Sequence, residues 1–178
     1  MTRVLITGAA SGLGRALALA WARRGARLVI ADLNAERGAE SVALCRAAGA
    51  ADAVFRLLDV RREADFAAAA EWLEREWAGV DVVVNNAGVA GGGRFEGIDE
   101  ADWQWMLDIN LMGVVRGCRA FTPLFKRQDG GQFVNIASMA GLLNPPSMSN
   151  YHVAKAGVIA LSETLAVELE PWHIRTLV

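Results

Sequence analysis

The stretch that decides the fold is Arg3-Val4-Leu5-Ile6-Thr7-Gly8-Ala9-Ala10-Ser11-Gly12-Leu13-Gly14, an apolar run followed by a glycine-rich loop. A segment of helical period follows it directly. Glycines allow the chain to turn sharply and let a phosphate approach the backbone, and the next helix offers its free N–H groups to an anion. The spacing G-x-x-x-G-x-G differs from the commonest dinucleotide fingerprint, G-x-G-x-x-G, and lacks the Gly-Lys-Ser/Thr of an ATP-binding loop. The stretch therefore predicts a phosphate loop between a first strand and a first helix.

Outward from this loop, short apolar runs alternate with longer segments of helical period. The run Asp81–Val84 is continuously apolar after its first residue, as expected of a strand covered on both faces. Strict alternation of this kind predicts an α/β fold with a doubly wound parallel sheet, in one domain over residues 1–178. The expected strands are Arg3–Ile6, Arg27–Ala31, Ala53–Leu57, Val80–Val84, Gln132–Ile136 and Ile174–Val178. The expected helices are Gly12–Arg24, Ala35–Ala47, Arg62–Trp77, Ala101–Arg127 and Tyr151–Leu169.

Two features qualify this pattern. Pro123 falls inside the long fourth helix, which we expect it to kink or divide. The sequence stops at Val178, within or just after the sixth strand, and an uncovered edge strand is a liability. We expect either that a partner covers this edge or that residues beyond Val178 exist in the native protein.

Composition excludes several function classes. The chain has 178 residues with 53% apolar and 21% charged residues, which is ordinary for a globular protein. Its net charge of −2 argues against a nucleic-acid or anionic-membrane surface, because both need a cationic excess. Cys45 and Cys118 lie far apart and read as buried thiols, and no His, Cys and carboxylate cluster suggests a metal. With neither a signal peptide nor a membrane-length apolar run, we expect a cytoplasmic protein.

Two acidic residues follow expected strands. Asp32 ends the second strand, near the spacing at which a carboxylate accepts hydrogen bonds from an adenosine ribose. A carboxylate there repels a 2′-phosphate and favours NAD over NADP, although Arg15 and Arg37 lie near enough in sequence to dilute the preference. Asp59 follows the third strand, where it has two readings of equal weight: a hydrogen-bond acceptor for an adenine amino group, or a cap for the next helix.

Tyr151 and Lys155 are four residues apart on an expected helix, which places them on one face. Tyr151 is the only Tyr in the sequence. A phenol, with an unperturbed pKa of about 10, is a poor base at neutral pH. A cation one helical turn away favours the phenolate, so this pair is suited to proton transfer.

Ser138 lies at the end of the fifth strand, on the sheet edge where ligands bind in doubly wound folds. Its hydroxyl can stabilise a substrate oxygen, or it can simply cap a turn. Asn110 is a polar residue in an apolar helical run. It is either part of a water-mediated path from Lys155 to solvent or a buried amide that bends its helix.

Taken together, these motifs resemble the short-chain dehydrogenase/reductase family along essentially the whole chain. The resemblance rests on Thr7-Gly8-x-x-x-Gly12-x-Gly14, Asn85-Asn86-Ala87-Gly88, Asn110, Ser138 and Tyr151-x-x-x-Lys155. It implies a Rossmann-type fold, a nicotinamide cofactor, and interconversion of a secondary alcohol and a ketone by hydride transfer. Members of the family normally continue past the sixth strand into a substrate lid and a seventh strand, both apparently lacking here.

The resemblance also implies roles for single residues. Tyr151 would be the general acid/base, Ser138 would position the substrate oxygen, Lys155 would bind the ribose and assist Tyr151, and Asn110 would join the proton relay. Asp32 matches the position that marks a preference for NAD. The expected cofactor contacts are Gly8, Ser11, Gly12, Leu13, Gly14, Asp32, Asp59, Val60, Asn86, Ala87, Gly88, Tyr151 and Lys155.

Other readings remain. The early end of the chain leaves room for a dinucleotide-binding or oligomerisation module without turnover. A serine hydrolase using Ser138 with His152 or His173 is disfavoured, because the glycines of a nucleophile elbow are missing and both histidines read as incidental. For the enzyme we expect a small alcohol or ketone as substrate, and a homodimer or homotetramer formed through the long helices. Neither nucleic acid nor membrane is an expected partner.

Overall fold

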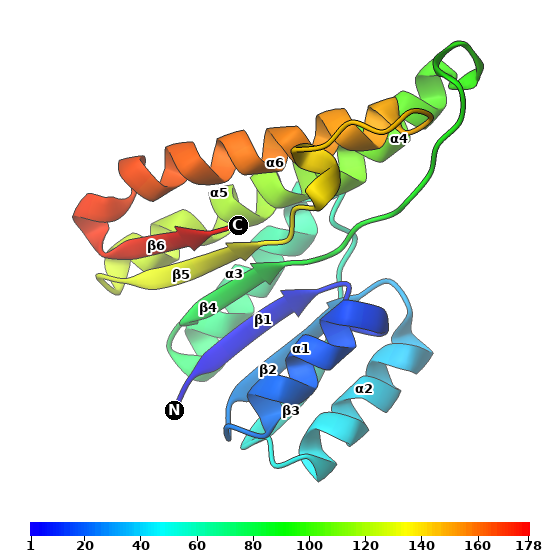
Figure 1. Cartoon of the computed structure of the whole chain (residues 1–178). Helices are drawn as coiled ribbons and strands as arrows, with labels where there is room; N and C mark the ends of the chain where they lie inside the picture. Colours follow the sequence, from blue (N-terminus) through cyan, green and yellow to red (C-terminus); the bar gives the residue numbers. More distant parts are fainter.

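The protein is described by a computed structural model covering residues 1–178. Its centre is one parallel sheet of six strands in the order β3-β2-β1-β4-β5-β6 (Figure 1). The strands are β1 (Arg3–Thr7), β2 (Arg27–Asp32), β3 (Asp52–Leu57), β4 (Val82–Asn85), β5 (Gly131–Asn135) and β6 (Ile174–Leu177). The doubly wound α/β sheet expected from the sequence is thereby confirmed.

Helices cover both faces of the sheet. The helices are α1 (Gly12–Ala22), α2 (Ala35–Ala47), α3 (Glu63–Trp77), α4 (Glu100–Asn110), α5 (Met112–Arg127) and α6 (Ser149–Glu168). Three short 3₁₀ helices lie in the connections between strands and α-helices: η1 (Phe95–Gly97), η2 (Met139–Gly141) and η3 (Glu170–Trp172).

Two separate apolar clusters hold these layers together. One joins α1 and α2 to alternate residues of the sheet such as Ile6 and Ile30. The other joins α3, α5 and α6 to the opposite face, around Leu5, Phe121 and Phe133. The central strands β1, β2 and β4 are buried on both faces and are apolar over most of their length, which explains the uninterrupted Val82-Val83-Val84 run.

The fourth helix differs from its prediction. Of the kink or division expected at Pro123, the division is wrong: the break lies at Leu111, between α4 and α5, and Pro123 sits within α5. One contact at the end of α4 and the exposure of Pro123 explain the position of the break. The Asn110 side-chain amide donates to the Met106 carbonyl, four residues back, and so competes with the helix backbone. Pro123 is itself exposed, and at an exposed position a helix tolerates the loss of one backbone N–H more easily.

The order of the strands determines where a ligand can bind. The chain runs outward from β1 to β3 and then returns to β4 on the other side of β1, so the order reverses between β1 and β4. In open parallel sheets ligands bind beyond the carboxyl ends of the strands at such a reversal. No helix of the structure is long and apolar enough to cross a membrane.

Candidate active site

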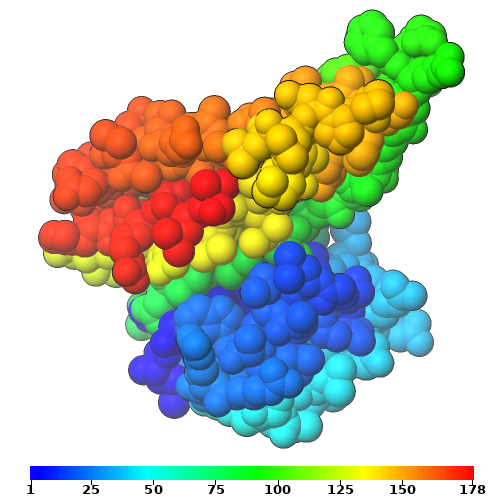
Figure 2. All heavy atoms as spheres, viewed as in Figure 1, coloured from blue at the N-terminus to red at the C-terminus, as the bar shows by residue number.

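A cavity of about 710 Å³ opens at the carboxyl ends of the strands, where β1 and β4 part. The surface is hollowed between the blue and cyan N-terminal segments and the green and orange ones (Figure 2). Of the residues expected in the site, all except Ser138 line this cavity: Gly8, Ser11, Gly12, Leu13, Gly14, Asp32, Asp59, Val60, Asn86, Ala87, Gly88, Asn110, Tyr151 and Lys155. The fold thus brings together residues that are far apart in the sequence.

The glycine loop lies at one end of the cavity. Gly8 and Gly12 have φ values of +66° and +52°, in the left-handed region that favours glycine. Gly14 has a different reason: a Cβ there would lie 2.6 Å from Nδ2 of Asn86 and would also strike the Gly8 carbonyl. The exposed N-cap of α1 is Ser11, and its side chain makes no capping hydrogen bond. The loop therefore presents the first turn of α1 to the cavity.

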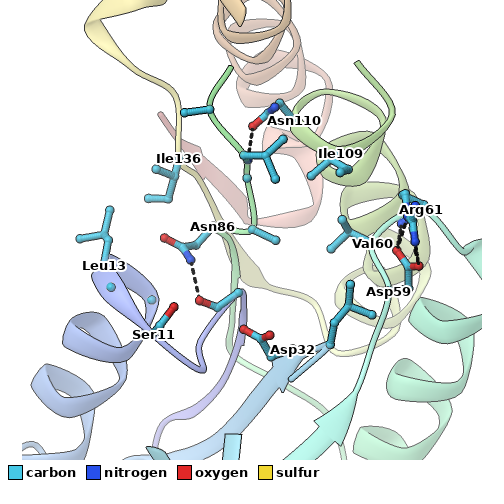
Figure 3. A pocket seen from close by; sticks show the side chains of 18 of the residues that line it. Ser11, Leu13, Asp32, Asp59, Val60, Arg61, Asn86, Ile109, Asn110 and Ile136 are labelled. Carbon is cyan, nitrogen blue, oxygen red and sulfur yellow. Dashed lines mark hydrogen bonds and ion pairs between the residues drawn. The ribbon is translucent and has the colours of Figure 1, made fainter. Parts of the chain in front are cut away.

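Hydrogen bonds between Thr7–Gly8 and Asn86–Ala87 join this loop to the end of β4. The buried hydroxyl of Thr7 accepts hydrogen bonds from the backbone N–H groups of Asn86 (3.0 Å) and Ala87 (3.1 Å). In return, the Asn86 side chain donates to the carbonyls of Thr7 (2.8 Å) and Gly8 (3.3 Å), as Figure 3 shows in part. The two ends of the reversal are therefore fixed relative to each other.

Asp32 is held at the end of β2 by backbone groups. One carboxylate oxygen accepts from the N–H of Ala10 (2.9 Å) and the other from the N–H of Asn34 (3.0 Å). The N-cap of α2 is Asn34, so Asp32 does not cap that helix. The Arg15 guanidinium makes no ion pair with this carboxylate; it donates to the Ala10 carbonyl (2.6 Å), to Ser41 Oγ (2.8 Å) and to a Glu40 carboxylate oxygen (2.7 Å).

Asp59 contacts a residue that the sequence analysis did not single out. Its carboxylate accepts hydrogen bonds from the backbone and the guanidinium of Arg61, at 2.6 to 3.1 Å (Figure 3). These bonds from Arg61 hold the pKa of Asp59 below its ordinary value. The alternative in which Asp59 caps the next helix is wrong, because Arg62 is the N-cap of α3. Arg61 itself lines the cavity.

Tyr151 and Lys155 lie one turn apart on α6 and both face the cavity. The Lys155 side chain is buried, with 4% of the residue exposed, and its Nζ donates to the Ile136 carbonyl at 2.7 Å. Burial lowers the pKa of Lys155. Its Nζ lies 5.8 Å from the centre of the Tyr151 ring. The structure thus places a buried amino group next to the only Tyr of the sequence.

Asn110 and Lys155 lie on either side of Gly88. A Cβ on Gly88 would come within 2.7 Å of Asn110 Oδ1 and within 3.8 Å of Lys155 Nζ. The Asn110 side chain is fully buried and accepts from the N–H of Val89 at 3.1 Å (Figure 3). Asn110 is thus a buried amide that ends α4 and borders the cavity beside Lys155, and its place in a proton path stays a prediction.

Ser138 lies next to Ala137, which lines the cavity, but Ser138 is not itself among the lining residues. It is the N-cap of η2, and its Oγ accepts from the N–H of Ala140 at 3.1 Å. The prediction that Ser138 caps a turn is thus confirmed. Because the hydroxyl oxygen acts as acceptor in this cap, its hydrogen stays available to a second group.

Sequence reasoning missed several lining residues. Trp105, Ile109 and Ile136 enter from α4 and the end of β5, and only the folded topology brings them to the cavity. Arg61 carries a detectable signal, since it lies two residues after Asp59 at a strand end. His152 read as incidental, yet it is buried, and both ring nitrogens contact carbonyl oxygens.

Other chemistries find little support in the side chains. Neither His152, whose ring faces loop carbonyls, nor His173, which pairs with Asp129, is bonded to Ser138. Cys45 and Cys118 are buried, and burial raises the pKa of both thiols, that of Cys118 to about 12, so neither is poised as a nucleophile. No group of three or more His, Cys, Asp or Glu residues is arranged to hold a metal ion.

Comparison with known proteins agrees with this geometry. The family model described as short chain dehydrogenase matches residues 2–178. A protein of Rhizobium meliloti (strain 1021), named "Probable galactose dehydrogenase GalD", is 39% identical over 175 residues. That alignment covers 97% of this chain and 67% of the relative.

Solved structures give the same picture. A short chain dehydrogenase/reductase from Burkholderia phymatum, solved in complex with NAD, has a TM-score of 0.93 and 38% identity, over 98% of this chain and 63% of that one. Carveol dehydrogenase from Mycobacterium avium, also in complex with NAD, has a TM-score of 0.93 and 32% identity, over 98% and 68% of the two chains. The present chain spans about two thirds of the length of these proteins.

Proposed function

The chain belongs to the short-chain dehydrogenase/reductase family, and on that premise we propose that it is an NAD-preferring oxidoreductase interconverting a secondary alcohol and a ketone. One observation carries the proposal: a single cavity extends from the glycine loop and Asp32 to Tyr151 and Lys155. A dinucleotide needs an anion site, a ribose acceptor and a reacting end in one continuous space, and these residues supply all three.

The residues present fit a nicotinamide dinucleotide. The first turn of α1 offers backbone N–H groups to a pyrophosphate, and open space surrounds the position of a Cβ on Gly12. Two structural neighbours were solved with NAD. The bound nicotinamide would supply or accept the hydride. Everything else in the reaction falls to this chain's own side chains.

Tyr151 is the proposed general acid/base, exchanging a proton with the oxygen of the substrate. Ser138 is proposed to donate its hydroxyl hydrogen to that same oxygen, because its own oxygen already accepts from Ala140. Lys155 uses one of its three N–H groups on the Ile136 carbonyl and keeps two, the number needed for two ribose hydroxyls. Asn110 would complete a proton path from Lys155 to solvent.

A preference for NAD is proposed from the surroundings of Asp32. Its carboxylate is fixed by two backbone N–H groups at the mouth of the ribose site, where a 2′-phosphate would be repelled. Of the two arginines that could offset this charge, Arg15 is occupied by Glu40 and Ser41, and Arg37 is absent from the cavity lining.

The test separates binding from turnover. NADH titrated into the protein should quench its Trp fluorescence, and a panel of ketones should then oxidise the bound NADH. Saturable quenching without turnover for any ketone or, in reverse, any secondary alcohol would instead favour a dinucleotide-binding module. A homodimer or homotetramer and a cytoplasmic location also stay predictions, the former open to mass measurement in solution.

A further inference from the structure

His152 follows Tyr151 on α6, with its ring turned into the protein. Only 6% of the residue is exposed. Nδ1 lies 2.7 Å from the carbonyl oxygen of Ala140, and Nε2 lies 2.8 Å from the carbonyl oxygen of Pro145. Both acceptors belong to residues 139–148, the segment between Ser138 and α6, which we call the 139–148 loop. One buried ring thus bridges two points of this loop.

The first of these points is connected to the proposed active site. The N–H of Ala140 donates to Ser138 Oγ at 3.1 Å, while the carbonyl of Ala140 is the one that His152 contacts. The residue that orients the Ser138 hydroxyl is therefore itself held by His152. Any shift of Ala140 away from α6 would turn the hydroxyl away from its present direction.

The second point lies at the far end of the loop, which has few other anchors. The side chains of Met139, Leu142 and Leu143 are 60–65% exposed, so they bury little apolar surface. No residue from Met139 to Met148 is charged, so ion pairs cannot hold the loop. The other contacts are mainly with backbone: Gly93 donates its N–H to the Ser147 carbonyl at 2.9 Å.

The start of the loop packs closely on α6. A Cβ on Gly141 would lie 2.9 Å from the carbonyl oxygen of Lys155 and 2.7 Å from Cδ1 of Ile159. This approach leaves the loop and the helix that carries Tyr151 and Lys155 in direct contact. A side chain that fastens the loop to this helix therefore also fixes the distance from Ser138 to Tyr151.

We propose that His152 is a positioning residue that clamps the 139–148 loop onto α6 and thereby holds Ser138 toward the reacting oxygen. Carbonyl oxygens only accept, so each contact needs a hydrogen from the ring; the doubly protonated ring serves both, and a neutral ring serves one. The part of the inference that concerns Ser138 rests on the proposed function. The clamping of the loop does not.

The test compares His152→Phe with His152→Gln in the full chain. Phe keeps the ring's bulk but removes both donors, and Gln restores an N–H donor. The matched control is His173→Phe, which changes the only other histidine, an exposed residue paired with Asp129. The first readout is amide hydrogen exchange within the 139–148 loop, which needs no substrate. We expect about tenfold faster exchange in His152→Phe, partial recovery in His152→Gln, and no change in His173→Phe.

The second readout is kinetic. In His152→Phe, kcat/KM for the ketone should fall about tenfold while the Kd for NADH stays within about twofold, because the loop lies outside the dinucleotide end of the cavity. His152→Gln should recover part of the loss, which a change in overall stability alone would not produce. Thermal unfolding establishes that each variant is folded, and where His152→Phe is not, His152→Leu, which also lacks both donors, takes its place.

The outcomes separate the two proposals. Unchanged loop exchange in a folded variant that lacks both ring donors overturns the clamp. Faster exchange together with a wild type that turns over no alcohol or ketone supports the clamp and contradicts the proposed function. Faster exchange with unchanged kcat/KM overturns the link from His152 to Ser138.

Discussion

The ammonium group of Lys155 lies 5.8 Å from the centre of the Tyr151 ring and is fixed there by a 2.7 Å hydrogen bond to the Ile136 carbonyl. The end of β5 therefore determines where the charge of α6 sits relative to the phenol. The position is costly, since burial lowers the pKa of Lys155 and so disfavours its charged form. The proposed chemistry gives a reason for a buried cation at this position, because it uses Lys155 beside Tyr151.

Replacing Lys155 should therefore affect both the cofactor and the proton transfer. Lys155→Met keeps most of the apolar stem but removes the charge and the donors. We expect kcat/KM to fall by about 10²–10⁴, with weaker NAD binding, in steady-state kinetics and fluorescence titration. The only other Lys, Lys126, packs over the Trp172 ring. Lys126→Met is the matched control and should leave both quantities unchanged; an equal loss in the two variants would contradict the assignment.

Tyr151→Phe should separate chemistry from binding. The variant keeps the ring and loses only the hydroxyl, so the cavity should keep its shape. We expect a loss of about 10²–10⁴ in kcat with the Kd for NADH within about twofold of wild type. The measurement is single-turnover hydride transfer beside fluorescence titration. A variant that retains most of its turnover would remove Tyr151 from the mechanism.

Asp32→Ala should shift the cofactor preference toward NADP. Removal of the carboxylate would end the proposed repulsion of a 2′-phosphate and the proposed hydrogen bonds to the ribose hydroxyls. We expect the ratio of kcat/KM for NAD to that for NADP to fall about tenfold or more, which corresponds to about 1.4 kcal/mol. Glu71→Ala, at an exposed acid on α3, is the control for loss of one negative charge. An unchanged ratio in Asp32→Ala would count against the ribose role.

The sequence was sufficient to predict the order of strands and helices. Strands that are buried on both faces of a sheet are continuously apolar, and such runs can be recognised locally in the sequence. The expected strands start and end within two residues of the observed ones, and Ala35–Ala47 matches α2 at both ends. What failed was the break in the fourth helix. Pro123 is the stronger local signal, but it lies at an exposed position within α5. The break instead follows Asn110, whose side chain bonds to the Met106 carbonyl, and the residue type alone does not predict that bond.

The candidate site was predictable to the same depth. The spacing of Gly8, Gly12 and Gly14 and the four-residue interval from Tyr151 to Lys155 can be recognised in the sequence. A phosphate loop and a proton-transfer pair accept few other residue types at these positions. The partner of Asp59 and the bridging role of His152 were not predictable, because each depends on a neighbour's side chain or carbonyl orientation. For Ser138, the position at a strand end could be predicted from the sequence, but the hydrogen bond that its Oγ accepts from the Ala140 N–H could not.

Gly14→Ala should damage the glycine loop more than its small size suggests. The added Cβ would strike the Gly8 carbonyl and lie 2.6 Å from Asn86 Nδ2, so Gly8 and Asn86, which a hydrogen bond joins, would both have to move. We expect a loss of about 1–3 kcal/mol in the free energy of unfolding, by urea denaturation, and weaker NADH binding. Gly97→Ala, where no atom lies within 4 Å of the new Cβ, is the control. Equal stability of the two variants would contradict the close approach.

The Arg3–Asp81 pair predicts how stability depends on pH. The backbone N–H and the guanidinium of Arg3 both donate to the Asp81 carboxylate, at 2.7 and 3.1 Å for one oxygen. Burial acts to raise the pKa of Asp81, but these bonds from Arg3 outweigh it, so the pKa lies below its ordinary value. A depressed carboxyl pKa stabilises the folded state above the unfolded value of about 3.9, and this contribution is lost as pH falls through the folded pKa.

Asp81→Asn should therefore be less stable than wild type at neutral pH, by about 1 kcal/mol because the side chain is partly exposed, or about 2–4 °C in Tm. Below about pH 3.9 the gap should narrow, since wild type also loses the charge of Asp81 on protonation. Thermal unfolding followed across the acid range measures both effects. Asp129→Asn, at an exposed acid paired with His173, supplies the comparison and should change Tm little at either pH. A gap for Asp81→Asn that stays constant into the acid range would mean that the ion pair is not its source.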